Sequence, residues 1–378
     1  MSGAAAGATP RLVRLATFNL ENLNAPGVFF AGRPGDPPYS DAEYEAKLAW
    51  AAGRLDEAGA GLVAFQEVFS DDAVRDLAAR AWRALGPGAA VLSPLTEGRR
   101  NEAAREGGGG VEATGPHVAL ATTLPVLGHD LVEAVPEAAR LSLAVAGEDG
   151  LESAVPLPLA RPHRPILRAR VRLAEGVAAT VLVAHLKSKI GELLEGEDRD
   201  DPVARAVGAA RSLVLRAAEA AALRALAVEA LARGDAVLVM GDLNDGPEAV
   251  TTRIAMGDPP RRAREGEPPP PPDTSLRSVH EVARYGPGRD AGRGAVFSHG
   301  HDGRRALIDH VLVSRQLHDR HAPDRVGRVR HARVLADHLD APPPPPGSER
   351  RPPTRSDHGL VVAEIEFDAP EPPGSAAG

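Results

Sequence analysis

Asn, Glu, Asp and His residues recur where short apolar segments of this chain end. One such position is unremarkable, because side chains at strand ends can reach water. Six strand ends carry these residue types: Asn19, Glu67, His185, the pair Asp242 and Asn244, Asp309, and the pair Asp357 and His358. Their recurrence predicts that the strand ends meet at one site.

These residue types suit hydrolysis of a phosphate ester. A phosphodiester is anionic and resists hydroxide, and a hard cation held by oxygen ligands neutralises and polarises it. Asn19, Glu67 and Asp357 are the candidate metal ligands. The chain contains no cysteine, which excludes thiolate zinc sites and thiol nucleophiles. We therefore expect Mg²⁺ or Mn²⁺.

The other residues suit proton transfer and charge stabilisation. Asp242 can hold and activate the attacking water, and Asn244 can donate a hydrogen bond to a phosphate oxygen. His358 can contact the phosphate or move a proton. Its ring needs a carboxylate that fixes its orientation, and Asp309 is the candidate.

Apolar runs alternate with helical patterns, which predicts a layered α/β fold that positions these residues. The predicted strands are 12–20, 62–65, 118–122, 166–173, 181–185, 236–240, 308–314 and 360–367. The predicted helices are 40–58, 70–85 and 202–233, the last in one piece or two. Ser40 and Glu43 fit a capping box at the start of the first helix.

The motifs run from Asn19 to His358, which favours one catalytic domain over residues 10–368. Glycine- and proline-rich stretches predict flexible insertions at 97–115, 257–273 and 340–355, since proline runs cannot join a hydrogen-bonded ladder. Residues 369–378 are predicted to be a disordered tail. We expect a monomer.

Six segments together resemble the endonuclease/exonuclease/phosphatase superfamily, whose fold is that of deoxyribonuclease I. They are TFNLEN (17–22), FQEV (65–68), AHLKSK (184–189), GDLND (241–245), IDHVLVS (308–314) and SDHGLVVAEI (356–365), in the family's order. The resemblance implies a four-layer α/β sandwich, with two facing mixed sheets flanked by helices and the site at one edge.

The resemblance also implies roles for individual residues. His185 is expected to contact the scissile phosphate, and Asp357 is expected to lie beside the metal. The remaining site residues take the roles given above. Lys187, Lys189 and Arg164 are candidates for contact with phosphate oxygens.

The order HLKSK, long helix, GDLND is most similar to bacterial nucleases that are often extracellular, so a DNA endonuclease is the first hypothesis. The segment AVFSHGH (295–301) departs from the Tyr-rich strand of those relatives. A net charge of −8 means that any contact with DNA must be local. The alternatives are a phosphatase or sphingomyelinase-like lipid phosphodiesterase, and an inactive scaffold that binds partners through its Pro-rich loops.

Other polar residues have structural interpretations. Gln66 is expected to satisfy backbone groups, and His310 alternates to the face opposite Asp309. His299 and His301 on a glycine loop are too few to hold a metal. The N-terminus lacks a secretory pattern, which favours a cytoplasmic protein. Secretion is the alternative that the resemblance offers.

Overall fold

Two six-stranded mixed sheets form the centre of the molecule. The computed structural model of the chain describes residues 11–30, 36–93, 115–146, 152–261, 263–264, 266–285, 296–301, 303–340 and 353–367. The first sheet has the order β15 (Gly327–Leu335), β16 (Leu360–Phe367), β1 (Arg11–Leu23), β2 (Leu62–Val68), β4 (His117–Thr122), β3 (Ala90–Leu92). The second has the order β11 (Leu276–Ser278), β14 (Asp309–Ser314), β10 (Ala236–Asp242), β9 (Val177–His185), β8 (Ile166–Ala174), β5 (Val126–Val132).

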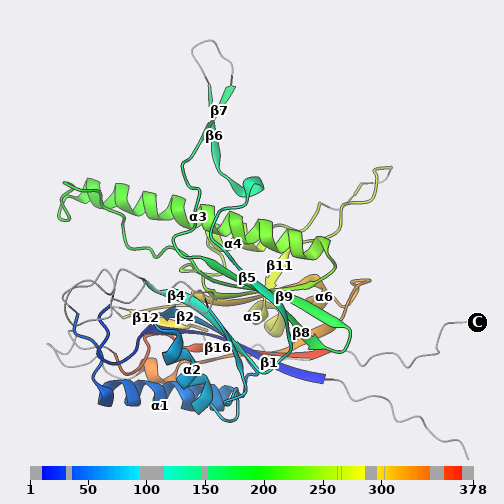
Figure 1. Cartoon of the computed structure of the whole chain (residues 1–378). Coiled ribbons are helices and arrows are strands. Elements are labelled where there is room, and N and C mark those ends of the chain that lie inside the picture. The colour runs from blue at the N-terminus through cyan, green and yellow to red at the C-terminus, as the bar shows by residue number, and fades with distance from the viewer. Residues whose placement is uncertain are drawn as a thin grey trace, which may run out of the picture.

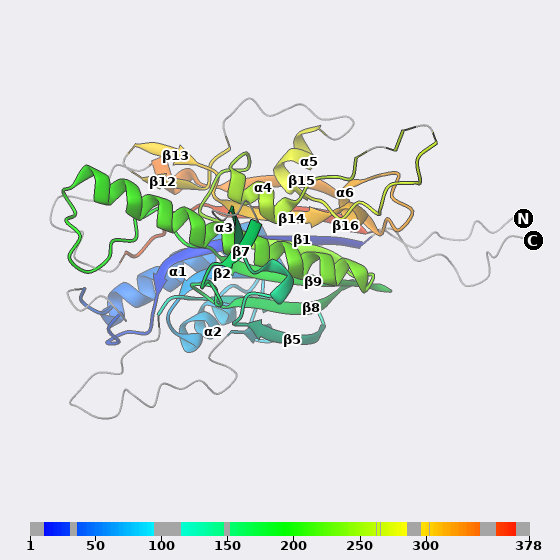
Figure 2. The ribbon, with the colours of Figure 1, turned by 90° about the horizontal axis from the view of Figure 1, so that it is seen from above.

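Helices cover the outer faces of both sheets. Figure 1 shows α3 (Pro202–Ala232) over the second sheet and α1 (Asp41–Ala58) and α2 (Asp71–Arg80) beneath the first. The shorter helices are α4 (Val250–Met256), α5 (Val279–Tyr285) and α6 (Arg315–His318), with 3-10 turns η3 (Glu137–Ala139) and η4 (Asp337–Asp340). The arrangement is the expected four-layer α/β sandwich, seen from above in Figure 2.

Two short ladders lie outside the sheets. The hairpin of β6 (Ser142–Ala146) and β7 (Glu152–Pro156) projects from the body beyond α3 (Figure 1). The other pairs β12 (His299–His301) with β13 (Arg304–Ala306). Among the residues described, no helix has the length and apolarity that crossing a membrane requires.

Strand alternation divides the core into three apolar layers. In β10, Leu238 and Met240 pack between the two sheets, whereas Val237 and Val239 pack under α3. In β1, Leu15 faces the inter-sheet core, and Phe18 packs on the side of α1 and α2. Successive strand residues point to opposite faces. Strands that are covered on both faces therefore appear in the sequence as the continuous apolar runs that predicted them.

The predicted helix over 70–85 is wrong at its end, because α2 stops at Arg80. The carboxylate of Asp56 on α1 accepts the backbone N–H groups of Arg83 and Ala84 at 2.7 and 3.2 Å. These donors are therefore turned away from the helical ladder. The helix predicted over 202–233 is formed in one piece, as the 31-residue helix α3.

The capping box of Ser40 and Glu43 forms as predicted. In the predicted insertion 257–273, the described residues form no helix or strand. Residues 97–114 and 341–352 of the other two insertions, and the tail 369–378, lie outside the described residues. The sequence analysis missed β5 and β15, in which polar residues or glycine interrupt the apolar ones. It also missed the short strands and helices.

Candidate active site

The candidate site lies where strands of both sheets end. β1 and β2 run parallel with Asn19 opposite Gln66, and β9 and β10 run parallel with His185 opposite Asp242. The carboxyl ends of parallel strands meet at one edge, so these side chains come together. The antiparallel β14 begins at Asp309, directly opposite Asp242.

A hydrogen bond links the two sheets at this edge. Asn19 Nδ2 donates to Asp242 Oδ2 at 3.1 Å and to Glu67 Oε1 at 3.3 Å. Asn19 Oδ1 accepts the backbone N–H of Glu21 at 3.0 Å. The side chain of Asn19 is fully buried, so its polar atoms depend on these partners. Its oxygen retains a second lone pair that can face a cation.

His358 and Asp309 form the predicted pair. His358 Nδ1 lies 2.8 Å from Asp309 Oδ2, and both side chains are buried. Ser298 Oγ also donates to Asp309 Oδ2, at 2.7 Å. Although burial opposes the change, Asp309 and then Asp242 raise the pKa of His358 well above its ordinary value. The ring is therefore held as a cation, with Nε2 3.9 Å from Asp242 Oδ2.

Asp242 lies at the centre of the predicted residues. Its Oδ1 accepts the backbone N–H of Asn244 at 2.8 Å, and His185 Nε2 lies 3.5 Å from its Oδ2. Burial, followed by the charge of Asp309, raises the pKa of Asp242 to about 7. Burial lowers the pKa of His185 well below its ordinary value, so His185 is neutral. Asn244 Nδ2 donates to Leu186 O at 2.8 Å and leaves a second N–H available.

Glu21, Glu67 and Asp357 form an acidic group beside this network. The backbone N–H of Asp357 donates to Glu21 Oε2 at 2.7 Å. The buried Lys47 donates to the backbone oxygens of Glu21 and Arg355 at 3.4 and 3.2 Å. Burial, with Asp357 and Glu67 adding to it, raises the pKa of Glu21 to about 8.

This group has the chemistry of a hard-cation site. The donors are carboxylate and amide oxygens, which Mg²⁺ and Mn²⁺ prefer. The three carboxylates of Glu21, Glu67 and Asp357 lie around the single ammonium of Lys47. A divalent cation fits such an excess of negative charge. The assignment of Asn19, Glu67 and Asp357 as its ligands stays a prediction, to which the structure adds Glu21 as a candidate.

A family model for the endonuclease/exonuclease/phosphatase family matches residues 16–358. The chain belongs to this family. Membership supports a divalent-metal-dependent phosphoesterase, and the matched range includes every predicted site residue. No curated protein matches the sequence significantly.

One similar solved structure supports the fold. An endonuclease/exonuclease/phosphatase family protein from Bacteroides thetaiotaomicron has a TM-score of 0.51 at 16% identity, over 96% of this chain and 100% of its own. Truncated TDP2 from Caenorhabditis elegans has 0.49 at 14% identity, over 94% and 97% of the two chains. A mannosyl-6-phosphatase from Bacteroides thetaiotaomicron has 0.45 at 16%, over 93% and 99%. At 16% identity the first of these structures supports the fold alone, and no argument rests on the other two.

His299, which the sequence analysis set aside, lies beside the candidate site. It forms an isolated bridge with His358, and their ring centroids lie 4.6 Å apart. His299 Nε2 lies 3.6 Å from Asp357 Oδ2, and the ligating atoms of His299, Asp357 and His358 are close enough to share one metal ion. The prediction considered only the two histidines of this loop, whereas Asp357 and His358 come from another segment of the chain. The side chain of His301 lies outside the described part.

The pair of His358 and Asp309 has further polar neighbours. The ligating atoms of Asp242, Asp309 and His358 also lie within 4.8 Å of one another. Ser356 Oγ donates to Asn19 O at 2.7 Å and accepts the N–H of His358 at 3.0 Å, so it couples β1 to the SDH segment. Sequence reasoning missed Ser356, although it directly precedes that motif.

The three predicted phosphate-contacting side chains of the phosphoesterase all bind protein groups. Lys187 Nζ lies 3.0 Å from Glu192, and Lys189 Nζ lies 2.8 Å from Asp245. Arg164 donates to the backbone oxygens of His185 and Leu186 at 3.4 Å each. Their contact with phosphate stays a prediction.

Helix α3 holds the HLKSK segment in place. Its buried Arg216 donates to the backbone oxygens of Lys187 and Ser188 at 3.0 and 3.1 Å. Its buried Glu219 accepts the backbone N–H groups of His163 and Lys187, each at 2.6 Å. The long helix between the two motifs therefore has a positioning role, which its position in the sequence alone does not reveal.

Two structural interpretations have different outcomes. His310 is buried, and its Nε2 lies 2.8 Å from Asp245 O, which agrees with its structural assignment. The expectation for Gln66 is wrong in its partner. Gln66 Oε1 accepts from the side-chain hydroxyl of Thr17 at 3.1 Å rather than from a backbone group, because parallel pairing of β1 and β2 brings the two side chains together.

Proposed function

We propose that this protein is a Mg²⁺- or Mn²⁺-dependent phosphodiesterase that cuts DNA endonucleolytically. The observation that carries the proposal is the continuous buried network Asn19–Asp242 and His358–Asp309, which joins the ends of both sheets beside three carboxylates. A core needs no such arrangement, because buried ionisable groups are costly unless they are paired.

In this proposal Asp242 is the general base. It accepts a proton from the attacking water, and a carboxylate whose pKa is near neutrality is suited to that transfer. The backbone N–H of Asn244 and the Asn19 amide fix both of its oxygens. The base is therefore already oriented before substrate binds.

His358 acts on the phosphate. Its Nδ1–H is bound to Asp309, so Nε2–H is the donor that faces the site and stabilises the charge that develops on a phosphate oxygen. His185 is neutral, and its Nε2 lies 3.5 Å from Asp242 Oδ2. It can accept or donate one hydrogen bond to the phosphate. Asn244 contributes its second N–H.

The acidic group holds the cation. Glu67, Asp357 and Asn19, with Glu21, are the proposed ligands, and Lys47 and the backbone N–H of Asp357 position Glu21. When bound, the cation neutralises the phosphate and polarises its P–O bonds.

DNA is the proposed substrate because the HLKSK and GDLND segments resemble bacterial nucleases. The names of similar structures include both TDP2 and a mannosyl-6-phosphatase, and a phosphatase remains the rival within the same site. Residues 10–368 act as one catalytic domain in this proposal, since β1 and the segment before β16 supply parts of the same network.

The test is a substrate panel with metal control. Purified protein is incubated with supercoiled plasmid DNA, RNA, sphingomyelin and inositol phosphates, in EDTA and in Mg²⁺ or Mn²⁺. We expect nicking of the plasmid that EDTA abolishes and metal restores, and no nicking by Asp242→Asn. Activity in EDTA would refute the metal mechanism. Turnover of lipid or inositol phosphate without DNA cleavage would establish the rival substrate class.

A further inference from the structure

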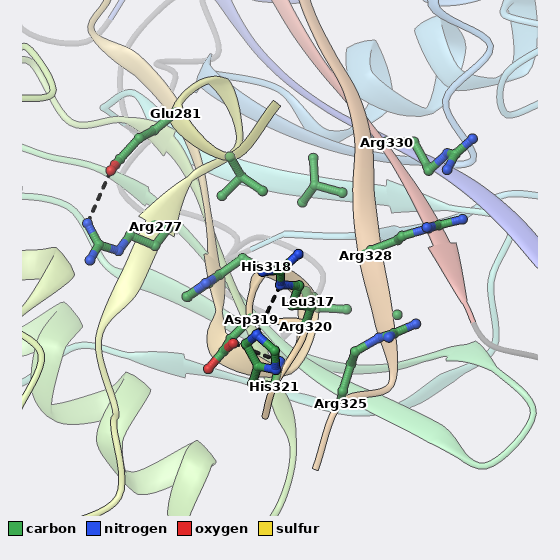
Figure 3. A pocket seen from close by; sticks show the side chains of 13 residues that line it. Arg277, Glu281, Leu317, His318, Asp319, Arg320, His321, Arg325, Arg328 and Arg330 are labelled. Atoms are coloured by element: carbon green, nitrogen blue, oxygen red, sulfur yellow. Dashed lines mark hydrogen bonds and ion pairs between the residues drawn. The ribbon is translucent and has the colours of Figure 1, made fainter. Parts of the chain in front are cut away.

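A pocket of about 660 Å³ lies away from the candidate active site. It is lined by residues of β11, α5, α6, β15 and the adjoining turns (Figure 3). β11 and β15 are edge strands of the two different sheets. β16 starts beside His358 and ends at Phe367, opposite Gly327 of the pocket lining. Its eight residues span about 25 Å, so the pocket lies at the opposite end of the sandwich.

The floor of the pocket is apolar. Val282 of α5, Leu317 of α6 and Val329 of β15 line it. Leu317 and Val329 belong to the apolar core between the sheets, and the partly buried Val282 packs against it. His318 lies beside them, and burial, followed by the charge of Arg277, lowers its pKa to about 4. His318 is therefore neutral at pH 7 and adds no charge.

Arginines surround this floor. Figure 3 shows Arg325, Arg328 and Arg330 in a row on one side, Arg277 and Glu281 on the opposite side, and His318, Arg320 and His321 between them. The lining contains five arginines and two carboxylates, Glu281 and Asp319. It therefore has three more positive than negative charges, although the whole chain carries a net charge of −8.

Two arginines of this row, Arg328 and Arg330, face the same carboxylate. Arg328 Nε lies 2.6 Å and Arg330 Nη1 3.5 Å from the same Glu366 carboxylate. Arg325 also interacts with Glu366, and the hydrogen bond from Arg328 holds the pKa of Glu366 below its ordinary value. Arg328 and Arg330 thus share one carboxylate. The side chains of Arg328 and Arg330 are 55% and 40% exposed, so they can reorient towards a ligand.

We propose that this pocket binds a small phosphorylated molecule that also carries an apolar ring, as a nucleotide does. The volume lies within the range of about 300–1,000 Å³ of small-molecule sites. The planar guanidinium fork matches phosphate oxygens. The apolar floor excludes water beneath a ring. This inference does not depend on the proposed function, because it concerns binding without turnover.

The test is calorimetric titration of the full-length protein in EDTA, which prevents metal-dependent binding at the active site. The probes are ADP, pyrophosphate, adenosine and a single-stranded deoxyoligonucleotide. We expect saturable binding of ADP at one site, with pyrophosphate and adenosine each binding at least about tenfold more weakly. The ADP molecule combines both interactions, whereas each fragment makes only one.

A charge-reversal pair localises the site. Arg320→Glu with Arg325→Glu changes two exposed lining residues and should raise the Kd for ADP at least about tenfold. The matched control is Arg172→Glu with Arg199→Glu, two exposed arginines outside the lining, which should change Kd less than about twofold. Melting temperatures of both variants report the fold.

Several results would overturn the proposal. One is that the wild-type protein does not bind ADP. Another is that both charge-reversal variants lose affinity for ADP equally, because that would be an effect of net charge. If pyrophosphate bound as tightly as ADP, the apolar floor would not contribute to binding. Tighter binding of the oligonucleotide than of ADP, lost in the lining variant alone, would assign the surface to nucleic acid instead of a small molecule.

Discussion

The His358–Asp309 pair allows a quantitative test of whether the buried network acts as a unit. The perturbations are His358→Ala, Asp309→Asn and the double variant. Asn preserves the volume of Asp309, which is fully buried, so it limits cavity effects. The matched control is Ser298→Ala, which removes the other side-chain hydrogen bond to Asp309 Oδ2 but leaves His358 in place.

The expected magnitudes follow from the contacts. His358→Ala removes a charged donor to the phosphate, which should lower kcat about a thousandfold. Asp309→Asn removes a charge-assisted hydrogen bond of 2.8 Å, worth about 1.5–3 kcal/mol, so kcat should fall about ten- to a hundredfold. Once His358 is absent, Asp309 has no ring to orient. The double variant should therefore resemble His358→Ala alone.

The assay is initial-rate hydrolysis of bis(p-nitrophenyl) phosphate at saturating Mg²⁺, with circular dichroism and thermal melting for each variant. Ser298→Ala should retain most of kcat while losing about 1 kcal/mol of stability, because Ser298 Oγ also accepts the N–H groups of Ile308 and Asp309.

Additive losses would refute the reasoning. Independent action predicts that the double variant falls about 10⁴- to 10⁵-fold, the product of the two single effects. An Asp309→Asn protein that melts far below wild type would instead identify Asp309 as a structural carboxylate whose main role is to satisfy Ser298. Equal losses in Ser298→Ala and Asp309→Asn would point to the same conclusion.

Three further predictions concern the acidic group and a buried histidine. Glu67→Gln should raise the Mg²⁺ concentration for half-maximal activity at least about tenfold with an unchanged fold, and an unchanged titration would show that Glu67 is not a ligand. Lys47→Met removes the buried ammonium beside Glu21, so Mg²⁺ should raise its melting temperature more than that of wild type; an equal increase would contradict the charge argument. Burial lowers the pKa of His280 from 6.5 to about 4. Its contribution to the free energy of unfolding is therefore fully present above about pH 6.5, and about 3 kcal/mol is lost as the pH falls through 4. Urea unfolding of His280→Phe should lack this part of the pH dependence, and an unchanged dependence would exclude His280 as its source.

The sequence predicts the part of the site that lies on parallel strands. His185 and Asp242 each end a continuous apolar run, and such runs form covered strands whose carboxyl ends meet. Asn19 follows a run that Arg14 and Thr17 interrupt, on a strand that also pairs in parallel. The fold class follows from the same runs. The contact between Asp309 and His358 depends on antiparallel strands from distant parts of the chain. The chemistry of a histidine that needs an orienting carboxylate, together with the resemblance, indicated it, whereas the hydrophobic pattern did not.

Residues that act through tertiary contacts were harder to predict. Lys47 is buried although it is charged, and the available signal was its position on α1 between Tyr44 and Ala51 on the apolar face. His299 gains its neighbours only when β12 pairs beside the SDH segment. The strand β15 was missed because Arg328, Arg330 and Arg333 interrupt its apolar residues, and an edge strand tolerates such charges.

Backbone conformation at the site edge adds a constraint that residue types alone do not express. Among the described residues, the non-glycine residues with positive φ are Glu21, Asn22, Glu67 and Asn244, at φ of 47°, 65°, 57° and 55°. All four lie in the motifs at the strand ends. The register of β1 and β2 changes near Glu21, Asn22 and Glu67. Asn adopts this conformation readily, whereas the same backbone conformation is unfavourable for Glu by about 1 kcal/mol or more. A register change redirects the side chains of a strand. The strain at Glu21 and Glu67 is therefore the cost of turning two carboxylates towards Asp357 and Asn19, and it falls on the residues that the proposed metal site requires.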